Sequence, residues 1–330
     1  MASHGMEVAG ATIRSVSGCR ICGSRSGNES CWATWRYFRC AKCHCLQREL
    51  TAAEYEALRP SYDPGDVACS DAVLDLEQRK ALILRHAGER RGSLLDVGCG
   101  VGGYLVAARE LGFDVLGVEP SAAHVAVGRE RLGLPILNGY FDPSMLGDRK
   151  FNVIILSHVI EHILDPKPFI ASLLSALTST GVLIILTPNS SSLAARALGK
   201  RWPMLRPPDH VTMLSTASVP HLLPSGYRAE LTTSEHSHEY ATNIASAVRD
   251  WARSFASPVP DSTALSPVAG ASLPAKLVRY GLAAASAPFY LAARATGRAS
   301  TIIATISAKL PASPAGHGRA RRSTASLFRV

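Results

Sequence analysis

Apolar and amphipathic segments alternate along the chain between about residues 93 and 240. The apolar runs are short and predict buried strands at 94–97, 115–118, 135–138, 151–156 and 181–187. The segments between them have helical spacing and predict helices at 104–111, 121–132 and 165–178, the last two with Ser121 and Asp165 as N-caps. This order predicts an α/β fold with a mostly parallel sheet and a ligand crevice at the carboxyl ends of its strands.

The flanking segments have other patterns. Two more strands, predicted at 227–234 and 298–310, would complete a Rossmann-like seven-stranded sheet with helices on both faces and an antiparallel last strand. The other segments are a Cys-rich region, a helical lead-in, a helical insertion and a disordered basic tail, at 1–50, 51–92, 241–297 and 311–330. We therefore expect one large domain over 93–310 and a small N-terminal one.

Composition and charge narrow the class of protein. Apolar residues make up 47% and charged residues 18%, and neither a secretory signal nor an apolar run long enough to span a membrane is evident. Residues 241–330 hold eleven Lys and Arg but two acids, which accounts for the whole net charge of +9. The favoured interpretation is a solvated tail on a cytoplasmic protein. Peripheral contact with an anionic membrane through residues 277–298 is the alternative, and nucleic acid is the least favoured partner.

Four cysteines near the N-terminus occur as two C-x-x-C pairs, Cys19 with Cys22 and Cys40 with Cys43. This spacing is typical of Zn²⁺ held by four thiolates, which would join two hairpins too small to form a core alone. Because such a site has no open coordination position, zinc is expected to be structural. Reduced cysteines without a metal are one alternative. Another is replacement of one ligand by a neighbouring side chain, namely Cys31, His44 or Cys45.

The first strand of the large domain leads into a glycine-rich loop. The loop runs from Asp96 through Gly98, Cys99, Gly100 and Gly102 before a helix. Glycines let a backbone approach a ligand where a Cβ would collide, and the helix N-terminus behind them offers unpaired N–H groups. This pattern alone is typical of several nucleotide sites. The next strand ends at Glu119, followed by Pro120, where a carboxylate can accept hydrogen bonds from both hydroxyls of a ribose.

Four landmarks in order give the chain a more specific resemblance. They are LLDVGCGVGG at 94–103, GVEPS at 117–121, HVIEHILDP at 158–166 and LTPN at 186–189. Together they resemble the class I S-adenosylmethionine (SAM)-dependent methyltransferases, in the group that includes the ubiquinone-biosynthesis O-methyltransferases. The resemblance covers about residues 70–240 and implies SAM as the cofactor.

The resemblance also implies a role for individual residues. Asp96 and Gly98 would line the methionine end of SAM, Gly100 would allow its close approach, and Glu119 would hold the ribose. Tyr140 or Phe141 falls where the adenine is usually held, although the acidic residue common there is missing. The other residues expected at the cofactor are Cys99, Gly102, Pro120, Ser157 and His158.

Candidates for chemistry follow the fourth and fifth predicted strands. His158, Glu161 and His162 would lie on neighbouring faces of a starting helix beside the methyl group. The ubiquinone-pathway enzymes have Glu-x-x-Glu-His there, implicated in binding a divalent metal, and here His158 replaces the first Glu. The alternatives are a metal site, a hydrogen-bond network at the helix start, and His158 as a base or substrate contact. His210, in a Pro-rich segment, is predicted as a second base or substrate contact, or as a loop-stabilising residue.

The acceptor is the least constrained part of the prediction. We expect transfer to a small molecule or to a glycan-linked or lipid-linked acceptor, most simply at oxygen. One alternative is an RNA methyltransferase that uses the zinc ribbon, although the fourth strand lacks the Asn/Asp-Pro-Pro-aromatic motif used for base amines. Another is a SAM-binding protein without turnover. The sequence does not determine the oligomeric state.

Overall fold

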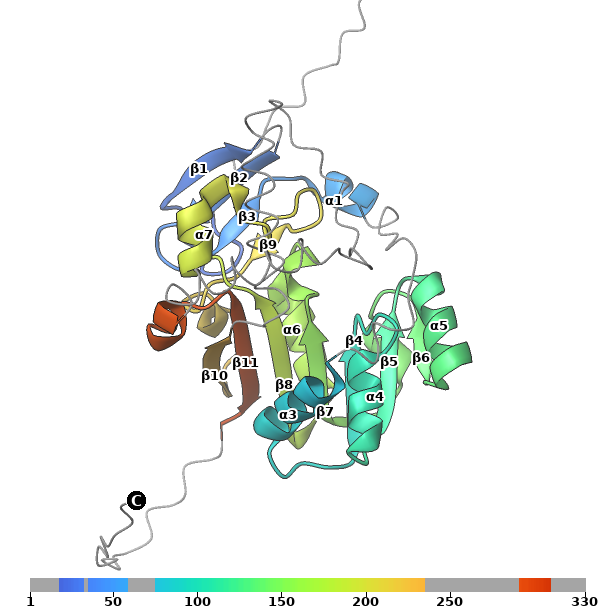
Figure 1. The fold of residues 1–330 in the computed structure, drawn as a ribbon. Coiled ribbons are helices and arrows are strands. Elements are labelled where there is room, and N and C mark those ends of the chain that lie inside the picture. Colours follow the sequence, from blue (N-terminus) through green and yellow to red (C-terminus); the bar gives the residue numbers. More distant parts are fainter. Residues whose placement is uncertain (1–17, 33–34, 59–74, 235–290, 310–330) are drawn as a thin grey trace, which may run out of the picture.

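The computed structural model describes residues 18–32, 35–58, 75–234 and 291–309 (Figure 1). The predicted tail at 311–330 and most of the predicted insertion at 241–297 lie outside these residues, as does most of the predicted membrane contact at 277–298. Within the described ranges, no helix combines the length and the apolar character that crossing a bilayer requires.

A seven-stranded sheet forms the centre of the fold. Its strands are β4 (Ser93–Val97), β5 (Asp114–Glu119), β6 (Ile136–Asn138), β7 (Phe151–Ser157), β8 (Leu177–Pro188), β10 (Tyr227–Ser234) and β11 (Thr301–Ala308). Their order is β10-β11-β8-β7-β4-β5-β6. The strands from β6 to β8 are parallel, and β11 is antiparallel to both of its neighbours. The predicted seven-stranded, mostly parallel sheet with an inverted last strand is therefore confirmed.

Helices cover both faces of this sheet, as predicted. They are α3 (Leu76–Ala87), α4 (Gly103–Glu110), α5 (Ala122–Leu132) and α6 (Pro166–Ser175), with short 3-10 turns at Pro143–Leu146, Ile160–His162, Gly199–Arg201 and Val219–Leu222. Successive residues of β4 belong to different clusters: Leu94 packs with α3 and α4, whereas Leu95 packs with α6. This division follows from the two-residue period of a strand and produces two apolar layers.

Two details of the helix predictions differ from the structure. Ser121 is the N-cap of α5, and its side chain accepts a hydrogen bond from His124 N, as expected. Asp165 is in the N-cap position of α6, but its side chain makes no capping hydrogen bond. The predicted helix at 165–178 ends at Ser175, because Leu177 already pairs with Phe151 in the sheet.

The N-terminal segment forms a second, four-stranded sheet with the order β1-β2-β3-β9. Its strands are β1 (Gly27–Trp32), β2 (Trp35–Cys40), β3 (Leu46–Arg48) and β9 (Thr212–Met213). The fourth strand comes from the large domain, more than 160 residues after β3. Helix α1 (Ala52–Leu58) follows the ribbon in the chain. Helix α7 (Leu193–Leu198) packs against the ribbon, since Ala194 and Ala195 share an apolar cluster with Tyr37. The ribbon is thus continuous with the large domain.

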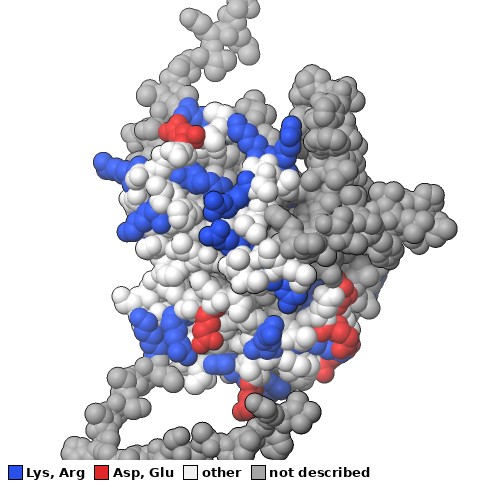
Figure 2. Space-filling model, turned by 60° about the vertical axis from the view of Figure 1, so that its left-hand side comes forward, with Lys and Arg blue, Asp and Glu red and all other residues white. Residues whose placement is uncertain are grey.

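Positive charge gathers on one outer face of the molecule. Figure 2 shows a surface on which Lys and Arg outnumber Asp and Glu. No acid occurs between Asp165 and Asp209, while Arg196, Lys200 and Arg201 are exposed in and after α7. The basicity of the described chain is therefore a property of its outer surface.

Candidate functional site

A cavity of about 710 Å³ opens where β4, β5 and β7 end. One side is formed by the glycine loop and the ends of these strands, including Gly98, Glu119 and Ser157. The opposite side is formed by α1, the start of α6 and the loop just before β9, including Tyr55, Phe169 and Asp209. The predicted crevice at the carboxyl ends of the strands is therefore present, and it is large enough for a cofactor with an acceptor.

Backbone conformation explains the glycines of the loop. Gly98, Gly100 and Gly102 have φ angles of 73°, 56° and 99°, in the left-handed region that suits glycine. A Cβ on Gly98 would lie 2.3 Å from Val159 Cγ2, whereas one on Gly100 would meet nothing within 4 Å. Gly98 is thus required by packing, and Gly100 leaves open space for a ligand. Gly102 is the N-cap of α4 and is not among the residues that line the cavity.

The side chain of Cys99 faces the core. It belongs to the apolar cluster that contains Leu105, and burial raises the pKa of its thiol. Cys99 is also absent from the cavity lining. Any contact of this residue with a cofactor would therefore involve its backbone.

The carboxylate of Glu119 is held in place by two backbone amides. Its Oε2 accepts from Gly100 N at 2.9 Å, and its Oε1 accepts from Ser121 N at 2.8 Å. His124 Nδ1 lies 3.6 Å from Oε1, beyond ordinary hydrogen-bond distance. A carboxylate has about four lone-pair positions, so about two remain for hydroxyl donors. The side chain lines the cavity next to Pro120. This geometry fits the two hydroxyls of a ribose.

Asp96 is a buried carboxylate with one unpaired oxygen, and it lies behind the residues that line the cavity. Its exposed fraction is 1%, and its Oδ1 makes no hydrogen bond among the described residues. Burial, reinforced by the negative charge of Glu119, raises the pKa of this carboxyl to about 7. The charge of Arg79 offsets only part of this effect, so the carboxylate fits a further cationic group, such as the amino group of SAM.

Aromatic side chains line the far end of the cavity. Tyr140 is 44% exposed, and Phe141 packs edge-on against Phe169 with ring centroids 5.9 Å apart. Both residues follow β6, as expected for the adenine end of the cofactor. The flat faces of these rings suit a planar base.

His158 and Glu161 form a pair at the end of β7. His158 has a φ of 55°, a rare angle for a residue with a side chain, and its Nδ1 lies 3.2 Å from Glu161 Oε1. Its ring lines the cavity. Glu161 Oε2 accepts from Thr187 Oγ1 at 3.1 Å. Residues 160–162 form one turn of 3-10 helix, so the expected starting helix is not continuous with α6, which begins at Pro166.

The Glu161 carboxylate is completely buried, which opposes its ionisation. The hydrogen bond from His158 and the charge of that histidine outweigh burial and bring the pKa of Glu161 to about 2. Both carboxylate oxygens have partners within the protein. Glu161 is therefore ionised near neutral pH and orients the His158 ring.

His210 lies behind this pair. It is 4% exposed and does not line the cavity. Its Nδ1 lies 2.6 Å from Met204 O, and its ring meets His162 edge-on at 4.8 Å between centroids. Burial lowers the pKa of His210 to about 3, so the ring is neutral and Nδ1 donates to the carbonyl. Ligand atoms of Glu161, His162 and His210 lie within 4.8 Å of one another, so this trio has a spacing that could hold a metal ion.

Several site residues escaped the sequence analysis. Thr187 supports Glu161 from the end of β8, and Tyr55 and Asp209 line the cavity from α1 and from the loop after β8. Thr187 could have been identified as a polar residue at the end of a strand otherwise made of apolar residues. Tyr55 carries no such signal, because only the tertiary fold brings α1 over the cavity.

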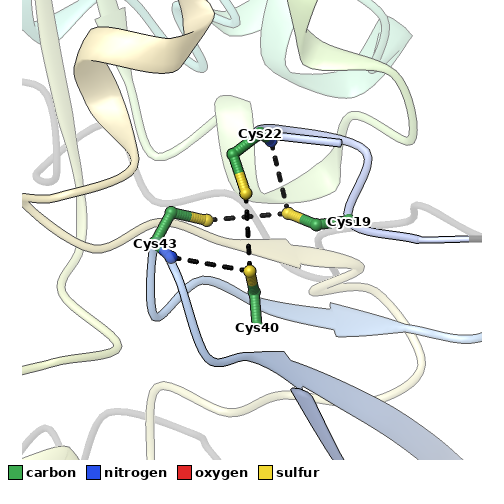
Figure 3. A group of neighbouring side chains, drawn as sticks. All are labelled: Cys19, Cys22, Cys40 and Cys43. Atoms are coloured by element: carbon green, nitrogen blue, oxygen red, sulfur yellow. Dashed lines mark hydrogen bonds between the residues drawn. The ribbon is translucent and has the colours of Figure 1, made fainter. Parts of the chain in front are cut away.

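The four predicted cysteine ligands come together in the ribbon (Figure 3). Their sulfur atoms lie within 4.8 Å of one another, with 3.6 Å between Cys19 and Cys43 and 3.5 Å between Cys22 and Cys40. Sulfurs of a tetrahedral zinc site are about 3.8 Å apart, so the arrangement fits zinc. Among the alternative ligands, Cys31 is exposed in β1, whereas Cys45 Sγ lies 3.3 Å from Cys19 Sγ, outside this group of four.

Comparison with known proteins supplies independent information. Residues 73–227 match a family described as a methyltransferase domain. The chain is 26% identical over 117 residues to a ubiquinone biosynthesis O-methyltransferase of Rhodopseudomonas palustris, covering 34% of this chain and 46% of that protein. It is 33% identical over 112 residues to the mitochondrial ubiquinone biosynthesis O-methyltransferase of Schizosaccharomyces pombe, covering 32% and 40%. The chain thus spans less than half the length of these relatives.

Solved structures give a weaker likeness. One of them is a SAM-dependent methyltransferase from Archaeoglobus fulgidus, with a TM-score of 0.42 and 17% sequence identity. The similarity covers 71% of this chain and 94% of that one.

Proposed function

We propose that this chain, whose residues 73–227 belong to the class I SAM-dependent methyltransferases, transfers the methyl group of SAM to a small-molecule acceptor, most simply at oxygen. The observation that carries this proposal is the single cavity that joins the glycine loop to the His158–Glu161 pair. When bound, SAM supplies an activated methyl group. Positioning and proton removal are the tasks left to the protein.

The residues on the first side of the cavity are suited to hold SAM. In this proposal Asp96 balances the cationic amino group, and Gly98 and Gly100 admit the methionine end. Glu119 accepts from the ribose hydroxyls, and Tyr140 contacts the adenine. Three of these assignments use a feature that the protein alone leaves incomplete: the unpaired Oδ1 of Asp96, the open space at Gly100, and the remaining lone pairs of Glu119.

His158 is the proposed general base. Its ring lines the cavity at the end of β7, where the resemblance places the methyl group. As the acceptor oxygen attacks, its proton would pass to the His158 ring, and the buried Glu161 carboxylate would stabilise the resulting imidazolium. The unusual φ of His158 directs the ring toward this place. His210 has a positioning role in this scheme, because it is buried and neutral behind Glu161.

The charge of the cavity bears on the class of acceptor. Its described lining includes Glu56, Asp165 and Asp209 but no Lys or Arg. Phosphate groups are normally held by Arg, Lys or clustered backbone amides, so this lining disfavours an RNA substrate despite the basic outer surface. We propose an acceptor that is uncharged or cationic at the part that enters the cavity. A glycan or lipid could be attached beyond it.

A labelling experiment tests the proposal. Purified protein is incubated with methyl-labelled SAM and with a host extract separated into small-molecule, lipid, protein and RNA fractions. We expect label in the small-molecule or lipid fraction. Label that appears only in RNA would overturn the proposed acceptor class, and tight SAM binding without label in any fraction would support a binding protein instead.

Replacement of His158 by Ala is expected to reduce label transfer by about 100-fold, because general-base catalysis typically contributes about 10²–10⁴-fold. SAM affinity, measured by calorimetry, should change by less than about threefold, since the proposed cofactor contacts remain. His221→Ala, on an exposed 3-10 turn, is the matched control and should transfer label normally. Normal transfer by His158→Ala would exclude His158 as the base.

The proposal also includes a structural zinc ion on the four cysteines and a location in a reducing compartment. Seven described cysteines are free thiols, including the four that fit zinc, which agrees with a reducing compartment such as the cytoplasm. The predicted membrane contact at 277–298 stays a prediction.

A further inference from the structure

We infer that the N-terminal ribbon supports a wall of the acceptor pocket from behind and that Arg48 is a positioning residue, which fixes the loop carrying Asp209 and His210. The ribbon would then serve methyl transfer directly, although it holds no reacting group. The inference rests on the proposed function for its effect on catalysis. Its structural part can be tested without knowing the acceptor.

Arg48 is a buried cation that joins β3 of the ribbon to the loop before β9. It is 5% exposed, and its Nη1 donates to Pro208 O at 2.8 Å. Its guanidinium lies 4.1 Å from the centre of the Trp35 ring, which provides a cation–π contact within the ribbon. No described acid lies within salt-bridge distance, and burial lowers the pKa of Arg48. A buried cation bound to a backbone carbonyl and an aromatic ring has a specific geometry to maintain.

Other ribbon residues hold the same loop. Arg20 Nη2 donates to Val211 O at 3.1 Å, and the backbone of Arg48 donates to the same oxygen at 2.9 Å. Tyr37 Oη donates to His210 O at 3.4 Å. Strand β3 then pairs with β9, with Leu46 opposite Met213. Three of the four backbone carbonyls from Pro208 to Val211 therefore accept hydrogen bonds from the ribbon.

The loop transmits this constraint to the proposed base. Val211 N donates to Glu161 O at 2.8 Å, so the strand that the ribbon holds also fixes the backbone of the residue that orients His158. Asp209, two residues earlier, lines the cavity. A shift of the loop would therefore change both the acceptor wall and the Glu161–His158 pair.

The ribbon also leads into a second part of the wall, helix α1. Helix α1 begins four residues after β3, and its start is a capping box: Thr51 N donates to Glu54 Oε2 at 2.6 Å and Glu54 N donates to Thr51 Oγ1 at 3.2 Å. Tyr55 of this helix lines the cavity. The capping box thus fixes the start of α1 close to the end of β3.

The thiol cluster anchors these contacts. Gln47 Nε2 donates to Cys19 Sγ at 3.1 Å, and Gln47 Oε1 accepts from Arg20 N at 3.1 Å. Cys43 O accepts from Ser215 Oγ, just beyond β9. Gln47 and Arg48 are neighbours on β3, so the strand that carries the positioning residue is bonded to a predicted zinc ligand.

Arg48→Met tests the inference because it keeps the bulk of the side chain and leaves the thiols unchanged. In the full-length zinc-loaded protein we expect amide hydrogen exchange in 208–213, including the Val211 amide, to increase at least about tenfold. Label transfer in the extract assay should fall by a similar factor. Zinc content and SAM affinity should stay within about twofold of wild type. Arg48→Lys, which keeps the cation over Trp35, should recover part of both effects.

The matched control is Arg36→Met, on the same sheet but paired with Glu29 and Glu49 away from the loop, and it should change neither readout. Unchanged exchange in 208–213 in Arg48→Met would overturn the inference. So would an equal increase of exchange throughout the ribbon and the large sheet, because that result would indicate general destabilisation. If the wild type labels no small molecule, the proposed function fails while the exchange measurement still decides the structural claim.

Discussion

Asp96→Asn is expected to weaken SAM binding at pH 8 by about 100-fold and also to raise the melting temperature of the ligand-free protein. The first effect follows from loss of the proposed counter-charge to the SAM amino group, and 100-fold corresponds to about 2.7 kcal/mol. The second follows from the elevated pKa of Asp96, which shows that the folded protein disfavours the ionised form. One substitution should thus improve stability and impair binding.

The pH dependence gives this prediction its sign. The pKa of Asp96 is about 7 in the folded protein, compared with 3.8 ordinarily. Below about pH 4 the carboxyl is protonated in both the folded and the unfolded protein, so it does not reduce the free energy of unfolding. As the pH rises from about 4 to about 7, the unfolded protein ionises first, and the free energy of unfolding falls. The amide that Asp96→Asn introduces would itself be buried with few hydrogen bonds, which costs part of the benefit. The net gain in the free energy of unfolding at pH 8 should therefore be on the order of 1–3 kcal/mol, and it should shrink toward pH 4. SAM affinity of the wild type should instead decrease as the pH falls below 7.

Calorimetric titration with SAM and thermal unfolding at pH 5 and pH 8 measure the two effects. Asp114→Asn is the matched control, because Asp114 is exposed at the start of the adjacent strand β5. Wild-type SAM affinity in Asp96→Asn would refute the role of Asp96 in cofactor binding. A lower melting temperature of its ligand-free form at pH 8 would refute the stability argument.

Cys40→Ser is expected to have the second large effect. The wild type should contain about one zinc per chain. The variant should lose it, because a four-thiolate site loses most of its zinc affinity when one thiolate is removed. We expect the ribbon to unfold and label transfer to fall at least tenfold, while SAM affinity changes by less than about threefold because the glycine loop belongs to the other sheet.

Metal analysis and amide exchange measure these outcomes, with Cys31→Ser as the matched control on the exposed strand β1. Retention of one zinc by Cys40→Ser would show that Cys45, which lies beside Cys19, can replace a ligand. Loss of zinc without any effect on transfer would separate the ribbon from catalysis.

Local patterns in the sequence predicted the large sheet because its strands are buried on both sides and are separated by strong helix signals. In β4, for example, the consecutive residues Leu94 and Leu95 are both apolar because they point into the two different apolar layers. The glycine loop was predictable for the same reason, since positive φ angles at Gly98 and Gly100 restrict the residue type.

Long-range pairing explains what the sequence did not reveal. The two residues of β9 are too few for a periodic signal, and their partner β3 lies more than 160 positions away. The burial of His210 depends on this pairing and on Tyr37, so a histidine in a Pro-rich loop could not be assigned to the interior from its neighbours. The left-handed φ of His158 is likewise set by the turn between β7 and α6.

The shared sheet of β1, β2, β3 and β9 also limits how this architecture could have arisen and how it can be engineered. A module whose last strand comes from the large domain cannot be removed cleanly. Without residues 1–50, β9 would lose the strand with which it pairs, and the backbone oxygens of Pro208, His210 and Val211 would lose their donors. A truncated enzyme should therefore tend to aggregate through this edge. Exchange of ribbons between relatives would need β9 and its loop to be transferred together.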